Sequence, residues 1–197
     1  LLEKTTGQPA YKSTVFDWFL STDFPAASPR SYNQNTYQGP VDSEIVAYWH
    51  TQLTDEHYQK LCEDRFLTRE TVDKHRLGWR PDWEAFVIPF FRPTGEADIV
   101  QFRMTRPTAK SKYLGMAGHN RGSVMNWDLL ETPQPYLIVL FGAFDSILAR
   151  QDGLPAVAFN GSLPFRKNEK TRVKELFSKQ TNVYVVPDNT VAEYDAA

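Results

Sequence analysis

The stretch that decides the fold runs from residue 135 to residue 190. It opens with PYLIVLFGAFDSILARQDGLPAVAFNGS and closes with NVYVVPDNT. Three apolar runs, at 136–141, 156–159 and 183–186, are separated by two helix-like segments. Because strands that alternate with helices form parallel sheets covered by those helices, the pattern predicts an α/β fold.

Polar residues follow each of these predicted strands. Asp145 comes shortly after the first strand, Asn160 directly after the second and Asp188 after the third. The carboxyl ends of the strands border the ligand crevice of an open α/β sheet. We therefore expect the three side chains to face one hollow.

The same stretch resembles the TOPRIM domain of primases, topoisomerases and related nucleases. That family carries a Glu-Gly-x-x-Asp turn after its first strand and an Asp-x-Asp turn after its third. Here the first turn reads Phe141-Gly142-Ala143-Phe144-Asp145 and the second reads Asp188-Asn189-Thr190. The glycine, the acid that follows it and the first acid of the second turn match. Phe141 replaces the family's Glu, and Thr190 replaces its last Asp.

The resemblance implies a site for Mg²⁺ or Mn²⁺ in which Asp145 and Asp188 are the catalytic and metal-binding residues. Mg²⁺ is bound by oxygen ligands, mostly carboxylates, waters and substrate phosphates. Phe141 offers no ligand and Thr190 only a hydroxyl, so two carboxylates are expected to hold one metal weakly. Both acids also have structural interpretations, Asp145 as a first-turn acid that stabilises a helix and Asp188 as a turn residue.

The preceding sequence predicts a helical region and then a small mixed subdomain with a β-hairpin. Thr54 and Thr68 are expected to cap short helices, Gly78 to end the second of these, and 93–95 to form the turn of the hairpin. The alternation of apolar and polar residues places Gln101 and Arg103 on one strand face. The expected domains are a helical segment at 1–20, a linker at 21–42, a primase-like subdomain at 43–134 and a TOPRIM-like domain at 135–197.

Basic residues are clustered although the chain of 197 residues has a net charge of only −2. One cluster is expected to bind nucleic acid, because Tyr113 and His119 interleave with its cations and because basic groups and aromatic planes together hold single strands. Its members are Arg103, Lys110, Lys112 and Arg121. The alternative is a solvated surface. A second cluster, at 167–174, has the spacing of the solvent-facing side of a helix.

Cys62 is the only cysteine, which excludes an internal disulfide and a cysteine-rich zinc site within the chain. A reducing compartment, the cytoplasm of a bacterial or host cell, is therefore expected. His50, His57 and His75 do not have the spacing of metal ligands and are expected to be structural or solvated. No apolar run approaches the roughly 18 residues of a membrane helix, so no membrane partner is expected.

The resemblance implies a primase-like DNA replication protein of a virus, phage or mobile element. Such a protein binds a single-stranded DNA template and joins ribonucleotides into RNA primers with divalent metal, beside a replicative helicase that is fused or separate. One alternative is a catalytically degenerate TOPRIM module that binds nucleic acid, and another is a TOPRIM nuclease. Both chain ends fall inside helix-like sequence, so a fragment is expected. Because Phe141 and Thr190 replace two of the family's acids, little or no primer synthesis by this fragment is expected.

Overall fold

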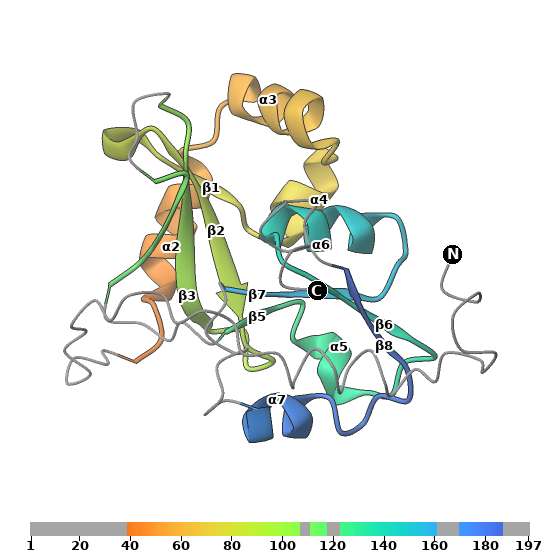
Figure 1. Ribbon diagram of the computed structural model, residues 1–197. Coiled ribbons are helices and arrows are strands. Elements are labelled where there is room, and N and C mark those ends of the chain that lie inside the picture. The colour runs from red at the N-terminus through yellow and green to blue at the C-terminus, as the bar shows by residue number, and fades with distance from the viewer. Residues whose placement is uncertain (1–38, 107–110, 118–122, 161–169, 187–197) are drawn as a thin grey trace.

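The computed structural model describes residues 39–106, 111–117, 123–160 and 170–186, which form two four-stranded sheets (Figure 1). The expected helical segment at 1–20 and most of the expected linker at 21–42 lie outside these residues. The first sheet has the order β1-β2-β3-β4, with bounds Gly78–Arg80, Ala85–Phe91, Ala97–Met104 and Tyr113–Gly115. The second has the order β5-β7-β6-β8, with bounds Val124–Met125, Ala156–Phe159, Leu137–Leu140 and Val183–Val186. The predicted α/β class is confirmed.

The second sheet contains the three strands that the sequence predicts. Strand β6 pairs in parallel with β7 on one side and with β8 on the other. Helix α6 (Ala143–Gln151) connects β6 to β7, and α7 (Lys170–Leu176) lies between β7 and β8 along the chain. The short strand β5 pairs antiparallel to β7, so the sheet is mainly but not entirely parallel. The sequence pattern does not predict β5, because two residues are too few to show a period.

Among the described residues, the helices that precede the first sheet are α2 (Ser43–Thr51), α3 (Asp55–Arg65) and α4 (Arg69–Lys74). The predicted caps are confirmed. The Thr54 N–H donates to Nδ1 of His57, and the Thr68 hydroxyl accepts from the Thr71 N–H. These bonds satisfy backbone N–H groups that have no partner within the first turn of a helix.

The prediction that Gly78 ends a helix is wrong. Helix α4 ends at Lys74, and Gly78 is the first residue of β1. A Cβ atom at position 78 would lie 2.7 Å from the carbonyl carbon of Trp49 in α2. This glycine therefore lets β1 approach the backbone of α2.

The predicted β-hairpin is confirmed as β2 and β3, which pair antiparallel across a turn that contains Gly95 at φ +84°. Val100 and Phe102 are buried, whereas Gln101 and Arg103 are partly exposed on the other face of β3. Strand β1 leads into the hairpin through a 3₁₀ turn at Pro81–Trp83.

The two sheets are joined by a shared apolar core. Ile88, Phe90 and Ile99 of the hairpin pack in one cluster with Phe144 and Ile147 of α6. Helix α2 covers the opposite face of the first sheet, and α5 (Asp128–Glu131) and α7 lie beneath the second sheet in Figure 1. The shared core fixes α3, β3 and α6 relative to one another. No helix within the described ranges has the length and apolar character to cross a membrane.

Candidate functional site

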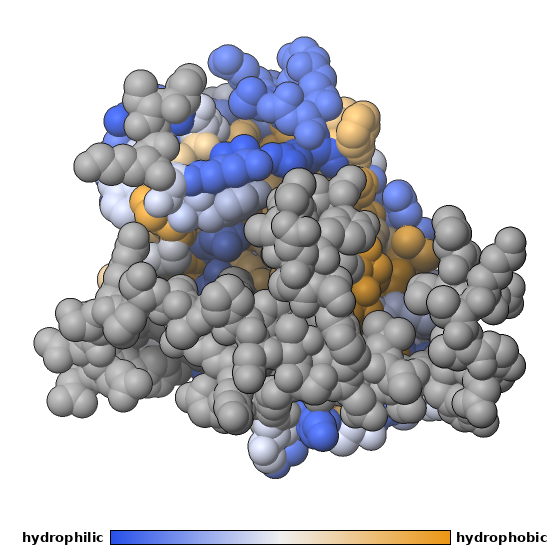
Figure 2. Space-filling view, viewed as in Figure 1, coloured by the Kyte–Doolittle hydropathy of each residue, from blue (hydrophilic) through white to orange (hydrophobic). Residues whose placement is uncertain are grey.

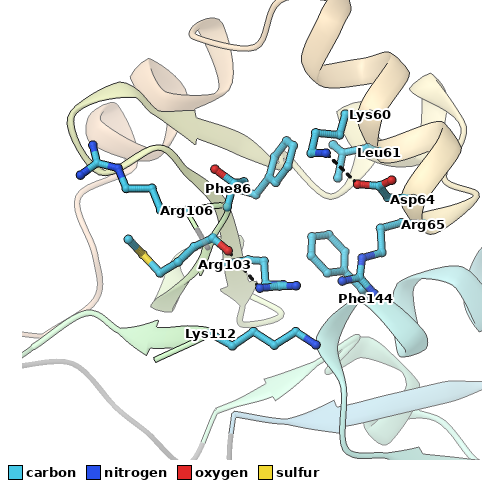
Figure 3. Close-up of a pocket in the computed structure, with 11 residues that line it drawn as sticks. Lys60, Leu61, Asp64, Arg65, Phe86, Arg103, Arg106, Lys112 and Phe144 are labelled. Atoms are coloured by element: carbon cyan, nitrogen blue, oxygen red, sulfur yellow. Dashed lines mark hydrogen bonds and ion pairs between the residues drawn. The ribbon is translucent and has the colours of Figure 1, made fainter. Parts of the chain in front are cut away.

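A cavity of about 420 Å³, here called the basic pocket, lies between α3, β3 and the start of α6 (Figure 3). Its walls come from elements far apart in the sequence, which the shared core brings together. Figure 2 shows a strongly hydrophilic surface beneath α3 on this side of the molecule. The lining residues are Lys60, Leu61, Asp64, Arg65, Phe86, Arg103, Met104, Thr105, Arg106, Lys112 and Phe144.

The basic pocket is cationic. Five of its side chains are basic, namely Lys60, Arg65, Arg103, Arg106 and Lys112. Two of them are neutralised, because Lys60 pairs with Asp64 at 3.0 Å and Arg106 pairs with Glu84 at 2.9 Å. The other three form no ion pair with an acid in the described part of the chain. Their charge is available to an anion.

Aromatic rings hold two of these cations in place. The Arg65 guanidinium lies 5.2 Å from the centre of the Phe144 ring, and that of Arg103 lies 5.1 Å from the centre of the Tyr113 ring. Nη1 of Arg103 donates to the carbonyl of Met104 at 2.9 Å, whereas its buried Nε has no acceptor in the described residues. A buried N–H group without an acceptor costs free energy, and a phosphate oxygen would satisfy it.

Tyr113 links the basic pocket to the predicted catalytic acid. Burial raises the pKa of the Tyr113 hydroxyl; the nearby Arg103 and Arg65 guanidinium groups lower it, and the Asp145 carboxylate raises it. The charges of Arg103, Arg65 and Asp145 all affect the pKa of Tyr113 because these side chains lie around it. Asp145 is thus close enough to Tyr113 for its charge to oppose those of the two guanidinium groups.

Asp145 is the third residue of α6, and its side chain is exposed. A Cβ atom at position 142 would lie 2.0 Å from Oδ2 of Asp145. Gly142 has φ −103° and ψ 131°, which any residue can adopt. The backbone at this position therefore does not require glycine, whereas a side chain there would force the Asp145 carboxylate to move. The position of Asp145 also suits the structural interpretation of a first-turn acid, which remains open.

Phe141 packs as an apolar residue. It is partly buried and lies against the core cluster on the far face of the second sheet, with Val139 and Phe159. No group of three His, Cys, Asp or Glu side chains that could hold a metal is present among the described residues. Asp188 and Thr190 lie outside them. The described residues at this edge thus contribute one carboxylate, Asp145, and do not form a metal centre by themselves.

Asn160 stands at the carboxyl end of β7, but its amide does not face an open hollow. The residue is buried, and its Oδ1 accepts a hydrogen bond of 3.2 Å from Nε2 of Gln101. Whether Asn160 shares a hollow with both acids stays a prediction, because Asp188 lies outside the described residues. Its amide is used to bind the hairpin to the second sheet.

Of the four basic residues predicted to bind nucleic acid, two line the basic pocket and two are not described by the structure. Arg103 and Lys112 line the basic pocket, whereas Lys110 and Arg121 lie outside the described residues. The sequence analysis missed Arg65. It stands at the end of α3, where acidic and basic residues alternate, so only the packing of α3 over the hairpin shows that it faces the same pocket.

Where they are described, the residues expected to be structural or solvated have such roles, while Lys167 lies outside the described residues. Nδ1 of His50 lies 2.6 Å from the carbonyl of Leu77, and Nε2 of His75 lies 3.1 Å from Oδ1 of Asn126. Lys174 is exposed on α7, and Phe177 is buried beside that helix.

No family model and no curated protein matches the chain. Its fold is nevertheless similar to solved structures of primases. The Escherichia coli primase catalytic core aligns with a TM-score of 0.60 at 17% identity, over 78% of this chain and 63% of that one. The primase fragment of the bacteriophage T7 primase-helicase protein aligns with a TM-score of 0.54 at 15% identity, over 68% of this chain and 56% of that one.

A DnaG primase catalytic domain bound to single-stranded DNA also aligns, with a TM-score of 0.61 at 16% identity, over 78% of this chain and 61% of that one. The chain therefore has the fold of TOPRIM-type primase catalytic cores, as the sequence resemblance predicts. It spans about 62% of the length of a DnaG catalytic core.

Proposed function

We propose that this chain is a primase-like DNA replication protein that binds a single-stranded DNA template and ribonucleotides at the basic pocket. One observation carries the proposal. Three cations without acidic partners in the described residues, Arg65, Arg103 and Lys112, line one pocket at the start of α6, the helix that carries Asp145.

The chemistry of the pocket suits a polyphosphate. Guanidinium groups donate paired N–H groups that match phosphate oxygens, and a lysine adds a point charge. The partly exposed ring of Tyr113 beside Arg103 gives a base apolar surface to contact. The helicase of the T7 primase-helicase neighbour motivates a replicative helicase, fused or separate, as the protein partner of this chain.

Primer synthesis requires bound metal in addition to the cations that bind DNA. Asp145 and Asp188 are the proposed ligands of Mg²⁺ or Mn²⁺, a metal that stabilises charge on reacting phosphates when bound. Because Phe141 packs in the core, the family's Glu has no replacement at that position. We therefore propose that binding is retained and that synthesis by this chain is weak. The same observation favours the alternative of a degenerate binding module over that of a nuclease.

The binding half is tested by titrating a fluorescent single-stranded oligonucleotide at several salt concentrations. Each phosphate contact lowers the slope of log affinity against log salt by about 0.7 for single strands. We expect a variant with both Arg103→Ala and Lys112→Ala to bind at least about tenfold more weakly at low salt, with a slope smaller by about 1.4.

A matched control removes two positive charges from exposed positions elsewhere, by Lys174→Ala and Lys179→Ala. This control should bind nearly as the parent does, and thermal unfolding should show that both variants are folded. If the Arg103 and Lys112 variant binds as tightly as the parent, the strand does not use the basic pocket.

A further inference from the structure

Phe66 adopts an unusual conformation at the end of α3. Its backbone is left-handed, with φ 58° and ψ 24°, and its residue is 72% exposed, more than the other exposed large hydrophobic residues of the described chain. Glycine is the usual residue at such a helix end, because a side chain crowds the backbone there. A bulky aromatic residue in this conformation is an outlier that calls for an explanation.

The local structure holds this position firmly. The side chain of Gln151, the last residue of α6, donates from Nε2 to the carbonyl of Phe66 at 3.0 Å. Its Oε1 accepts from the N–H of Thr68 at 2.8 Å. Between them Leu67 is buried in the shared core. The turn is thus bound to α6 on both sides of Leu67, and the Phe66 ring is presented on a rigid support.

Neither the helix end nor the core requires the ring. Glycine would end α3 with less strain, and Leu67 supplies the apolar contact that follows a left-handed helix end. The ring of Phe66 belongs to none of the three apolar core clusters. A contact with a partner is the remaining use for a large, exposed and rigidly supported aromatic ring.

The position of Phe66 indicates the partner. The preceding residue, Arg65, lines the basic pocket together with Lys60 and Leu61 of the same helix. Phe66 does not line the pocket itself, but it follows Arg65 at the end of α3, so a strand that contacts Arg65 and continues along that end of the helix would reach its ring. Every base has a flat π surface, and aromatic side chains bind unpaired bases by stacking without reading their sequence.

We propose that Phe66 is a stacking platform for an unpaired base of the single strand held in the basic pocket. The inference rests on the proposed template binding and extends it from phosphate contacts to base contacts. Arg65 and Phe66 then act as neighbours, one on the backbone of the strand and the other on a base.

The test measures binding of the full 197-residue chain to two fluorescent strands of equal length, oligo-dT and an abasic strand. Phe66→Gly should bind oligo-dT about tenfold more weakly than the parent, since stacking on one base contributes this much. Its affinity for the abasic strand and its salt slope should match those of the parent, because the phosphate contacts remain. Phe66→Trp should bind oligo-dT at least as tightly as the parent.

Phe66→Gly is chosen because it relieves the left-handed conformation, so its unfolding temperature should be equal to or above that of the parent. Tyr48→Ala removes an aromatic residue that is 56% exposed on α2, and it should leave both affinities unchanged. A strand containing 2-aminopurine adds a direct signal, because stacking quenches its fluorescence in the parent and should not do so in Phe66→Gly.

The inference is overturned if Phe66→Gly binds oligo-dT as the parent does, or if it loses equal affinity for both strands. A loss confined to association with another protein, with strand affinity unchanged, also overturns it. If the Arg103 and Lys112 double variant weakens binding but Phe66→Gly does not, only the stacking role fails. If the parent binds neither strand, the proposed function fails as well.

Discussion

At the scale of single residues, a side chain added at either of two glycines would meet a neighbouring group. Gly78 lies against the backbone of Trp49, and Gly142 lies against the carboxylate of Asp145. The two neighbours differ in what they can do. The backbone of α2 is fixed by packing, whereas an exposed carboxylate can move. The same substitution should therefore destabilise the fold at one glycine and displace a candidate site residue at the other.

Gly78→Ala should be strongly destabilising. Its Cβ would lie 2.7 Å from the carbonyl carbon of Trp49, so β1 or α2 would have to shift. Overpacking of this kind typically costs about 1–3 kcal/mol of unfolding free energy. Gly115→Ala is the control, since its Cβ would meet only Cδ1 of Ile99 at an ordinary 3.6 Å. The measurement is the free energy of unfolding by denaturant. Equal values for Gly78→Ala and Gly115→Ala would contradict the close approach of β1 to α2.

At the scale of elements, one histidine connects α4 to the second sheet. Nε2 of His75 lies 3.1 Å from Oδ1 of Asn126, and Nδ2 of Asn126 donates to the carbonyls of Ser146 and Ala156. Asn126 therefore joins α4, α6 and β7. Since both of its donor bonds go to carbonyls, its Oδ1 is the acceptor and the His75 Nε2–H is the donor.

His75 should make folding sensitive to mild acid. Burial lowers the pKa of its imidazole; hydrogen bonds to Thr71 and Asn126 oppose this, and the charges of Arg150 and Lys74 add to it. The unfolded chain, with an ordinary pKa of about 6.5, then binds a proton more readily than the folded chain. The unfolding free energy is thus highest above about pH 6.5 and falls as the pH decreases toward the lower folded pKa.

The measurement for His75 is the unfolding free energy of the parent and of His75→Gln between about pH 8 and pH 5. The variant should be less stable at high pH but lose less stability on acidification. His57, whose pKa is also lowered by burial, stays in both proteins and cancels in the comparison. If the unfolding free energies of the parent and His75→Gln changed with pH in parallel, His75 would not be the cause of the loss of stability in acid.

The sequence predicts these elements better than their contacts. Strands 156–159 and 183–186 are predicted to the residue, because Pro and polar residues bound each apolar run. Asn160 could not be placed in the same way. Its partner Gln101 is 59 positions distant, and only the packing of the hairpin on the second sheet shows that the amide is used. Arg65 was missed for the same physical reason.

At the scale of the whole molecule, the basic pocket exists because two sheets share one core. Its cations come from α3, from β3 and from the segment before β4, and its aromatic wall comes partly from α6. A loss of packing between the sheets would therefore separate the proposed phosphate-binding residues from one another and from α6. Binding and catalysis nevertheless make different demands on this arrangement. The pocket needs only cations in place, whereas phosphoryl transfer also needs carboxylates that hold metal.

The final prediction concerns this catalytic demand. Because Phe141 lies in the core and the described residues contribute only Asp145 at this edge, the chain should bind Mn²⁺ weakly and synthesise little or no primer. The assay is primer synthesis on single-stranded DNA with ribonucleotides and Mn²⁺, run beside Asp188→Ala and Asp145→Asn. Robust synthesis that either change abolishes would show that the remaining acids suffice and would contradict the prediction.

The matching gain-of-function variant carries Phe141→Glu and Thr190→Asp. It should bind Mn²⁺ more tightly in a calorimetric titration, because two anionic ligands return to positions where the family has them. The gain should come with a loss of stability, since Phe141 is partly buried against Val139 and Phe159 and a charged group there loses that packing. Removing a large apolar side chain from such a site costs up to about 3 kcal/mol. Phe141→Leu with Thr190→Asp is the control, because it keeps an apolar residue at position 141 and adds only one carboxylate. If this control binds Mn²⁺ as tightly as the Glu variant, the residue at position 141 does not limit the metal site, and the weakness must be attributed to Thr190.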